Sequence, residues 1–457
     1  MMHFFHRLLL LALLASTACA APGMMPRSTL PLPEGFSASG GTTLPDRWWL
    51  AFDDPVLADL VERGLEHNPG LLATWARLDQ ADAAARGAGA SRYPSVNASG
   101  GAGANVRQGG DPSLSISLGL SASYEVDLWG RVDATIDAAT LEAQASEMDL
   151  RAAAITLSAQ IATTWYQLVT RYAEHELLLQ QVELAQRVLD LTRQRYEGGL
   201  ITVVDVLSQE QNLESLRADV AASEEAAVLL EHSLAVLLGR SPTESVAPKT
   251  TVLATLPPLP AAGVPSELME RRPDVVATYL RVQAANRNVA AAITAQYPRL
   301  SLSASLSQAL TISTQTLVGW AASLVGNLVA PLFDGGKLAA DAERARARLS
   351  EVVQGYAQTV LAALAEVEDA LTSEQAGQVA LESLDRQLAL ATEILARVQE
   401  AYTAGLSDYL KVLDAMRSLQ SLQRQRLQLQ SDLLQTRIAL CRALAGSWTL
   451  ERPEDAQ

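Results

Sequence analysis

Residues 113–130 read Ser113-Leu-Ser-Ile-Ser-Leu-Gly-Leu-Ser-Ala-Ser-Tyr-Glu-Val-Asp-Leu-Trp-Gly130. The first twelve alternate strictly between apolar and small polar residues, which predicts a β-strand with one apolar and one polar face. From Gly130 the pattern becomes helical and continues to Gly198, on the order of 100 Å at 1.5 Å per residue. Globular helices average only about 11–12 residues. This junction of a strand with a very long helix decides the fold.

Three further strands are expected in the chain. Residues 300–307 alternate in the same way, and Val96–Val106 and Val318–Ala330 are weaker partners. The lengths fit the about 9–11 tilted residues that cross a bilayer. Soluble sandwiches usually expose Lys and Glu, whereas these faces carry Ser, Gly and Asn, which favours the wall of a barrel. Open edges are not tolerated in lipid. Either the strands lie outside a membrane, or several chains pool them, two copies giving eight and three giving twelve.

The chain is a tandem duplication. An offset of 204 residues aligns His67–Arg77 with Arg271–Arg281 and Tyr93-Pro94 with Tyr297-Pro298. From Gly130 onward the offset is 206 residues, which pairs Gly130 with Gly336, Tyr196 with Tyr402 and Leu238 with Leu444. The two extra residues must lie between Pro298 and Gly336, and we expect them in the strand–loop–strand segment, because loops accept insertions. Solenoid repeats are about 20–50 residues long, so this is a duplicated domain.

Each half is expected to contain a short helix, two strands and a long helical hairpin. The short helices are Asn68–Ser91 and Arg272–Gln296, with Pro69 and Pro273 in the favoured first turn. The long helices, 130–198 and 336–404, return through Thr202–Gly239 and Asp408–Ala445. Apolar residues recur in sevens along the first long helix, as in a coiled coil: Leu141, Met148, Ile155, Ala162 and Val169.

Composition excludes several kinds of protein. Of 457 residues, 35 are Lys or Arg and 51 are Asp or Glu, giving a net charge of −16. So acidic a chain repels nucleic acid. Its 5 histidines and 2 cysteines supply neither a disulfide framework nor a Cys/His metal cluster. No catalytic constellation is found, so we expect no cofactor, no metal and no enzymatic activity.

The N-terminus has the anatomy of an export signal. Arg7 precedes a short apolar run that ends at Ala18, which predicts a signal peptide over residues 1–18. Residues 16–19, Ser-Thr-Ala-Cys, resemble a bacterial lipobox, in which Cys19 becomes the lipidated first residue; Ser16 replaces the usual Leu. Ala18-Cys19-Ala20 also fits ordinary signal peptidase, so the two cleavages remain alternatives. No later run of some 18 residues is apolar enough for a membrane helix.

Six segments, in this order, carry a resemblance to a known family: Trp48-Trp49 with Phe52-Asp-Asp-Pro55, Tyr124-Glu-Val-Asp-Leu-Trp-Gly130, Arg272-Pro-Asp274, Leu332-Phe-Asp-Gly-Gly336, residues 401–414 and Ala443-Leu-Ala-Gly-Ser-Trp448. The chain resembles the TolC-like outer-membrane factors, specifically the NodT/OprM-like lipoprotein branch that works with RND efflux pumps. The resemblance implies a homotrimer in the outer membrane, with four strands per chain pooled in a twelve-stranded barrel. A long α-helical tunnel would extend from this barrel into the periplasm.

The resemblance and the duplication together set domain boundaries. Residues 1–18 are the signal peptide, and 19–66 form a lipid-anchored extension with a first helix. The first repeat covers 67–241, with strands at about 95–126 and a hairpin at about 130–239. A linker occupies 242–264. The second repeat covers 265–447, with strands at about 299–330 and a hairpin at about 336–445, and 448–457 form a tail.

The resemblance also places a periplasmic gate on the helix after the second hairpin turn. Leu410 falls on the family's apolar ring and Asp414 on its acidic ring; the spacing i, i+4 puts them on one helix face. Three carboxylates in a narrow pore would attract cations. Some members carry a second acid where this chain has Lys411, and the first repeat has Asp205 there. Tyr402 resembles a tyrosine that holds the closed state through interhelical hydrogen bonds. A solvated Asp and a packed Tyr are the plain alternatives.

The hairpin tips form another candidate site. Gly199 and Gly405 permit left-handed turns, and each precedes an apolar residue, Leu200 or Leu406. In the family such tips also contact the hairpins of a periplasmic adaptor, or membrane fusion protein.

The function that the resemblance implies is a passive duct. It would export small molecules or drugs from an inner-membrane RND-type pump through the periplasm and across the outer membrane. A type I protein secretion duct shares the architecture, and a periplasmic coiled-coil scaffold is the alternative from another class.

Overall fold

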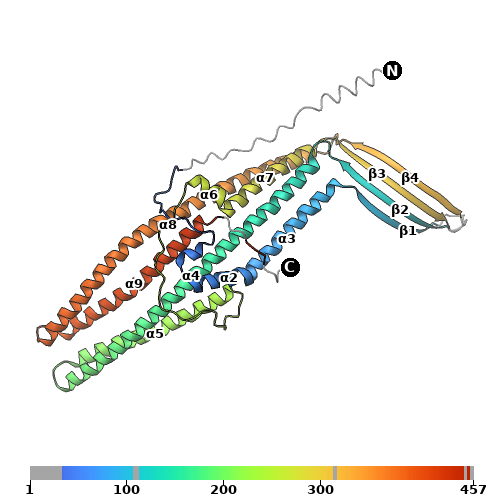
Figure 1. Cartoon of the computed structure of the whole chain (residues 1–457). Coiled ribbons are helices and arrows are strands. Elements are labelled where there is room, and N and C mark those ends of the chain that lie inside the picture. Colours follow the sequence, from blue (N-terminus) through green and yellow to red (C-terminus); the bar gives the residue numbers. More distant parts are fainter. Residues whose placement is uncertain (1–32, 106–112, 312–315, 447–449, 453–457) are drawn as a thin grey trace. The chain divides into compact units, whose positions relative to one another are not determined.

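The computed structural model describes residues 33–105, 113–311, 316–446 and 450–452 (Figure 1). The expected signal peptide, Cys19 and Trp448 lie outside the described residues. The chain divides into two compact units. The first takes in 77–147 and 277–358, and the second takes in 31–76, 148–276 and 359–457.

The first unit contains a four-stranded antiparallel sheet in the order β1-β2-β3-β4. Its strands are β1 (Ser95–Asn105), β2 (Ser113–Val126), β3 (Arg299–Thr311) and β4 (Thr316–Val329). The prediction of four strands is confirmed, although β3 continues past Ser307, where the alternation weakens. Within the described chain, β1 and β4 each pair on one side only. The sheet therefore has two open edges.

The alternation separates the two faces of the sheet. Leu120 lies opposite Leu306 on β3 and Ala98 on β1, so aliphatic side chains share one face. Serine hydroxyls share the other face and bond across the strands. The Oγ atoms of Ser95 and Ser123 are 2.8 Å apart. The two central strands, β2 and β3, therefore present an apolar wall on one side and a row of uncharged hydroxyls on the other.

The two extra residues of the second repeat lie after its last strand. The first strand pair spans 95–126 and the second spans 299–329, almost the same length. The turn to the long helix covers 127–130 in the first repeat and 330–336 in the second. Asp334 orders the longer turn, because its carboxylate accepts hydrogen bonds from the amides of Gly336 and Leu338 at 2.9 and 2.8 Å. The insertion therefore differs from the expectation: it lies in the turn between strand and helix.

The six helices for which bounds were predicted begin and end within two residues of those bounds. Pro69 and Pro273 are the first residues of their helices, where a missing N–H costs nothing. The helices are α2 (Pro55–His67), α3 (Pro69–Gly89), α4 (Arg131–Glu197), α5 (Val203–Leu237), α6 (Pro265–Arg271), α7 (Pro273–Thr294), α8 (Lys337–Thr403) and α9 (Tyr409–Leu444). Both α4 and α8 have 67 residues. Among the described residues, none of the helices is both long and apolar enough to cross a membrane.

Aliphatic seams hold these helices together within each unit. In the first unit, Val282 and Val289 of α7 pack with Leu349 and Val353 of α8. In the second unit, an apolar seam joins α4 to α5, which returns beside it (Figure 1). Its buried members are Leu178, Ala185, Leu189, Val206, Leu213 and Leu216. Burying a Leu or Val side chain contributes about 1.5–3 kcal/mol, so these seams supply the main stabilisation of the long helices.

The N-terminal aromatic segment anchors in the second unit. Trp48 and Trp49, in the short 3-10 helix η2 (Trp48–Phe52), are fully buried. The indole N–H of Trp48 donates to the hydroxyl of Ser158 at 3.1 Å. Asp54 caps α2 and also accepts a hydrogen bond of 2.8 Å from the indole of Trp165. The Trp-rich motif therefore fixes the extension to α4.

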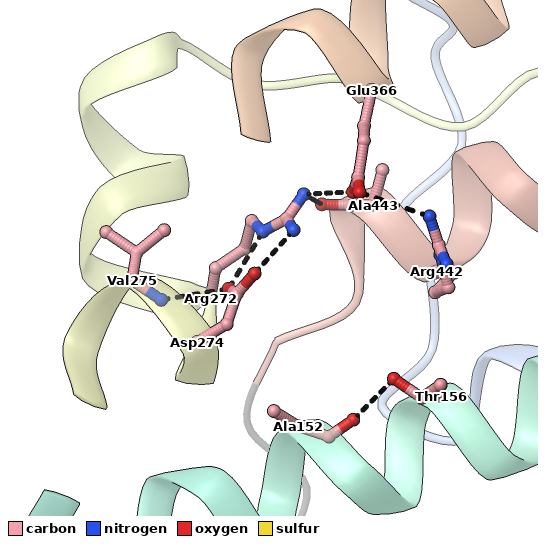
Figure 2. A network of polar contacts seen from close by, with 8 residues as sticks. All are labelled: Ala152, Thr156, Arg272, Asp274, Val275, Glu366, Arg442 and Ala443. Atoms are coloured by element: carbon pink, nitrogen blue, oxygen red, sulfur yellow. Dashed lines mark hydrogen bonds and ion pairs between the residues drawn. The ribbon is translucent and has the colours of Figure 1, made fainter. Parts of the chain in front are cut away.

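A polar network joins the start of α7 to the middle of α8 and the end of α9 in the second unit. Figure 2 shows the Arg272 guanidinium between the carboxylates of Asp274 and Glu366, with Arg442 also contacting Glu366. Burial alone would raise the pKa of Asp274, but the hydrogen bonds and charge of Arg272 outweigh it and hold that pKa below its ordinary value. A cavity of about 120 Å³ adjoins these residues. The Arg-Pro-Asp motif thus has a structural role here, since each carboxylate is paired.

A second ion pair, fully buried, holds the linker. Arg437 of α9 pairs bidentately with Glu374 of α8 and donates to the carbonyl of Pro257. Both charged side chains are almost completely buried. Removing one partner of a buried pair leaves the other charge uncompensated, which is strongly destabilising.

We predict that Glu374→Gln lowers the free energy of unfolding by about 3–5 kcal/mol, because Arg437 then keeps its charge in a buried site. Thermal unfolding followed by circular dichroism in detergent measures the effect. Glu393→Gln is the matched control, since Glu393 pairs with Arg397 on the exposed surface of α8, where an ion pair contributes little. Equal losses in the two variants would show that the buried pair has no special role.

Candidate functional site

The two hairpin tips have the same backbone geometry. At the first tip, Gly199 has φ +73° and the amide of Leu200 donates to the carbonyl of Arg195 at 2.9 Å. At the second, Gly405 has φ +77° and the amide of Leu406 donates to the carbonyl of Ala401 at 2.8 Å. This is the Schellman ending of a helix, which requires a left-handed residue that glycine adopts without strain. The glycines therefore occupy the positions that the turn demands.

Each tip presents a leucine to the surroundings. Leu200 is 76% exposed and Leu406 is 82% exposed. An apolar residue is common at this position of a Schellman ending, but both side chains remain largely exposed beyond any contact with their own helix. Single exposed leucines are ordinary on protein surfaces, but the repetition at equivalent positions marks the tips as a candidate contact surface.

Capping explains the difference between Asp205 and Lys411. In the first repeat, the Asp205 carboxylate accepts hydrogen bonds from the amide and hydroxyl of Thr202, at 2.9 and 2.8 Å. In the second, Asp408 itself caps α9 and accepts a hydrogen bond from the amide of Lys411 at 3.0 Å. An acid at the third helical position can bond back to a Thr or Ser at the cap, as in a capping box, whereas in the second repeat the cap residue itself is the acid. The Asp205 carboxylate is therefore engaged in its own helix turn.

Leu410 and Asp414 lie on the exposed face of α9. The opposite face buries Tyr409, Leu413 and Met416. In the part of the chain that the structure describes, no hydrogen bond or ion pair holds the Asp414 carboxylate. The two residues predicted for the gate thus share one face, one turn apart, and leave an apolar side chain and an unpaired charge open to a partner or a pore.

The contacts of Tyr402 are made by its ring, and its hydroxyl donates no interhelical hydrogen bond within the described residues. Its ring lies 5.9 Å from that of Tyr409, and the guanidinium of Arg195 lies 5.0 Å from its centroid. Its hydroxyl makes no hydrogen bond within the described residues. Tyr409 makes the interhelical bond: its hydroxyl donates to the side-chain oxygen of Gln209 on α5 at 2.8 Å, and the amide of Gln209 donates to the carbonyl of Ala185 at 2.8 Å. Burial raises the pKa of Tyr409 to about 12, so the donor proton is present at neutral pH.

This link belongs to a row of polar contacts between α9 and the first hairpin, which we call the polar seam. Arg417 donates to Asn212 at 2.8 Å, and Gln167 donates to Gln435 at 3.1 Å. Gln181 donates to Gln423 at 3.1 Å and accepts from Arg424 at 3.0 Å. Sequence reasoning missed these residues. A signal was present, because Gln209 occupies a position between Val206 and Leu213 on the apolar face of α5.

The described part of the chain contains no group of three or more His, Cys, Asp or Glu side chains placed to hold a metal ion. The concentrated features are therefore the tips, the exposed face of α9, the polar seam and the two-faced sheet.

We predict that Tyr409→Phe lowers the free energy of unfolding by about 1–3 kcal/mol, because it leaves the buried oxygen of Gln209 without a donor. Denaturant unfolding followed by circular dichroism measures the loss. The control is Tyr402→Phe. The ring of Tyr402 lies beside that of Tyr409, and its hydroxyl makes no hydrogen bond within the described residues. If both variants lose the same stability, the Tyr409 hydrogen bond does not stabilise the contact.

Comparisons with known proteins agree with this architecture. The family described as outer membrane efflux protein matches residues 60–240 and 264–446. The pyoverdine export outer membrane protein OpmQ of Pseudomonas aeruginosa is 32% identical, covering 95% of this chain and 97% of that protein. The cation efflux system protein CusC of Escherichia coli is 29% identical, covering 95% and 97%. The solved outer-membrane channel OprN superposes with a TM-score of 0.83 at 29% identity, covering 93% of this chain and 99% of that one.

Proposed function

The chain belongs to the outer membrane efflux protein family, and from this premise we propose that three copies form the outer-membrane duct of a tripartite efflux system. The observation that carries the proposal is the two-faced sheet with open edges, joined to helices of 67 residues. The aliphatic face suits lipid and the hydroxyl face suits a water-filled lumen. The helices are long enough to extend on the order of 100 Å from the membrane.

The trimer follows from the edges. The four strands leave β1 and β4 half-paired, and unpaired backbone groups are not tolerated in lipid. Single-chain bacterial barrels use eight or more strands, so three chains with four strands each give a barrel of ordinary size. The same three-fold arrangement would bring three copies of α9 around one axis.

We predict that the detergent-solubilised protein is a trimer. Multi-angle light scattering with the detergent mass subtracted should give three times the mass of the mature chain, because each copy needs two neighbours to pair β1 and β4. A clean monomer of correctly folded chain would refute the duct.

The cargo that we propose is a small molecule. The relatives are named for the export of pyoverdine and for cation efflux. A type I protein secretion duct has the same architecture and remains the competing function. The inward-facing serines carry no charge, which suits solutes of varied structure, while selection of the substrate would rest with the inner-membrane RND-type pump.

The hairpin tips are the proposed contact with a periplasmic adaptor. Leu200 and Leu406 are exposed at equivalent turns, so a trimer would offer six apolar tips to a ring of adaptor chains. Burial of such leucines in a complex is favourable, at about 25 cal/mol per Å² of apolar surface.

The gate that we propose consists of Leu410 and Asp414. Both lie on the exposed face of α9 near the second tip, where three-fold symmetry would make each a ring. The leucines would narrow the pore, and the unpaired carboxylates would attract cations. Lys411 lies on the same exposed side and would partly offset that charge.

We predict that Leu410→Ala with Asp414→Ala raises single-channel conductance in planar bilayers and lowers cation preference. The first change widens the constriction and the second removes its charge. Glu225→Ala is the matched control, because Glu225 is an exposed acid on α5 that has no partner in the described chain. A double variant that conducts like this control, with unaltered selectivity, would make Asp414 an ordinary solvated residue.

We also propose that Cys19 carries a lipid anchor, since residues 16–19 resemble a lipobox. We predict that Cys19→Ser abolishes acyl labelling and slows maturation while the barrel still inserts, because the buried Trp48 and Trp49 fix the extension independently. Mass spectrometry of the wild-type N-terminus tests the anchor. An unacylated N-terminus would assign the cleavage to ordinary signal peptidase.

A further inference from the structure

The two turns that lead from a strand into a long helix are equivalent in the repeat. Leu128-Trp129 follows β2, and Leu332-Phe333 follows β4. Their separation is 204 residues, the same shift that relates Tyr93-Pro94 before β1 to Tyr297-Pro298 before β3. Each repeat therefore has an aromatic residue after its second strand and a Tyr-Pro pair before its first.

Within one chain, the first aromatic residue contacts the second Tyr-Pro pair. The indole N–H of Trp129 donates to the carbonyl of Pro298 at 2.8 Å, and the rings of Trp129 and Tyr297 are 5.3 Å apart. This contact closes the end of the β2–β3 pairing, where Val126 lies opposite Leu300. The aromatic pair thus marks the point at which one repeat joins the next.

The aromatic residue after β4 and the Tyr-Pro pair before β1 have no such contact within the described chain, and their side chains are exposed. Phe333 is 92% exposed, Leu332 is 96% exposed and Tyr93 is 73% exposed. They lie at the two outer edges of the sheet, since Phe333 follows β4 and Tyr93 precedes β1. Strands β2 and β3 lie between these edges, and neighbouring strands are about 4.8 Å apart. Phe333 and Tyr93 of one chain therefore do not meet.

We propose that Phe333 packs on Tyr93 and Pro94 of a second copy of this chain, and thereby closes each junction between copies as Trp129 closes the junction within a copy. The inference rests on the proposed trimer and names a contact within it. Phenylalanine has no N–H donor, so this contact is apolar and lacks the hydrogen bond that Trp129 gives to Pro298.

The repeat also fixes the strand register of that junction. Val126 lies opposite Leu300 in the chain, and the shift of 204 converts this pair into Ala330 opposite Val96 of the next copy. The side-chain faces agree with this register. Ala330 follows Leu328 by two residues and so shares the aliphatic face, to which Val96 also belongs. A slip by one residue would turn serines toward the aliphatic side.

A second copy explains the exposure better than lipid or another protein. The partner surface for an aromatic residue in this turn is already present in the chain as Tyr297-Pro298, and Tyr93-Pro94 reproduces it. The local backbone matches as well, because the amides of Tyr93 and Tyr297 each donate to a carbonyl three residues earlier, at 3.0 and 3.1 Å. The open strand edges lie beside the two halves of the contact.

Cysteine cross-linking between two tagged chains tests the contact. One chain carries Phe333→Cys and the other carries Tyr93→Cys, each with a different tag, and both are produced in the same cells. Intact outer membranes are treated with a short bifunctional thiol reagent. We expect a covalent dimer that contains both tags, and no dimer when either chain is produced alone. The native Cys441 is buried and is left in place.

A control pair within one chain calibrates the reagent. Trp129→Cys with Tyr297→Cys should give a cross-linked peptide by mass spectrometry and no dimer, because that contact lies within a copy. Phe333 and Tyr93 are exposed in the chain, so their replacement leaves its own core intact. As a second readout, Phe333→Asp should lower the temperature at which the trimer dissociates, and Phe333→Leu should restore it.

The outcomes separate this inference from the proposed function. A trimer by light scattering that gives no mixed dimer, while the control pair reacts, overturns the contact and leaves the duct standing; Phe333 would then face lipid or another protein. A chain that forms no trimer overturns both. A mixed dimer with unchanged trimer stability in Phe333→Asp places the residues together but overturns their role in closing the junction.

Discussion

A backbone N–H or C=O group inside a bilayer has no water to bind, so every strand in lipid must be paired on both sides. The sheet satisfies this requirement at its three internal pairings and leaves the outer sides of β1 and β4 open. Folding in the membrane therefore includes assembly, because one copy alone lacks partners for two rows of backbone groups. The side chains are sorted by face as well: aliphatic residues share one face, and serines on the other face bond to one another and to backbone carbonyls.

Duplication supplies a simple solution to that constraint. Each repeat contributes two strands and one long hairpin, and the β2–β3 pairing joins the repeats within the chain. A junction of the same kind, repeated between copies, closes a ring without a new fold. The insertion at 330–336 shows where the repeats were free to differ. Strand register fixes the sheet and apolar seams fix the hairpins. The turn between them tolerates extra residues, and in the second repeat the Asp334 carboxylate accepts two of its hydrogen bonds.

Local patterns were sufficient to predict most of the fold. Alternation predicted the strands, Pro69 and Pro273 predicted two helix starts, and the tip glycines predicted left-handed turns because each effect acts within a few residues. Helical spacing was sufficient to place Leu410 and Asp414 on one face of α9, whereas the exposure of that face follows from the packing of the opposite one. The link from Tyr409 to Gln209 could not be predicted in the same way, because the two residues are 200 positions apart. The Arg437–Glu374 pair similarly depends on which faces of α8 and α9 meet.

The distribution of polar and apolar contacts bears on how the hairpins can move. Within the first hairpin, α4 and α5 share an apolar seam whose separation would expose aliphatic surface to water. Between this hairpin and α9, the contacts combine an apolar contact at Val188 with the hydrogen bonds of the polar seam. Water can replace a hydrogen bond at small net cost, about 0.5–1.5 kcal/mol, whereas it cannot replace aliphatic packing. Separating α4 from α5 within the first hairpin is therefore costlier than separating this hairpin from α9 along the polar seam.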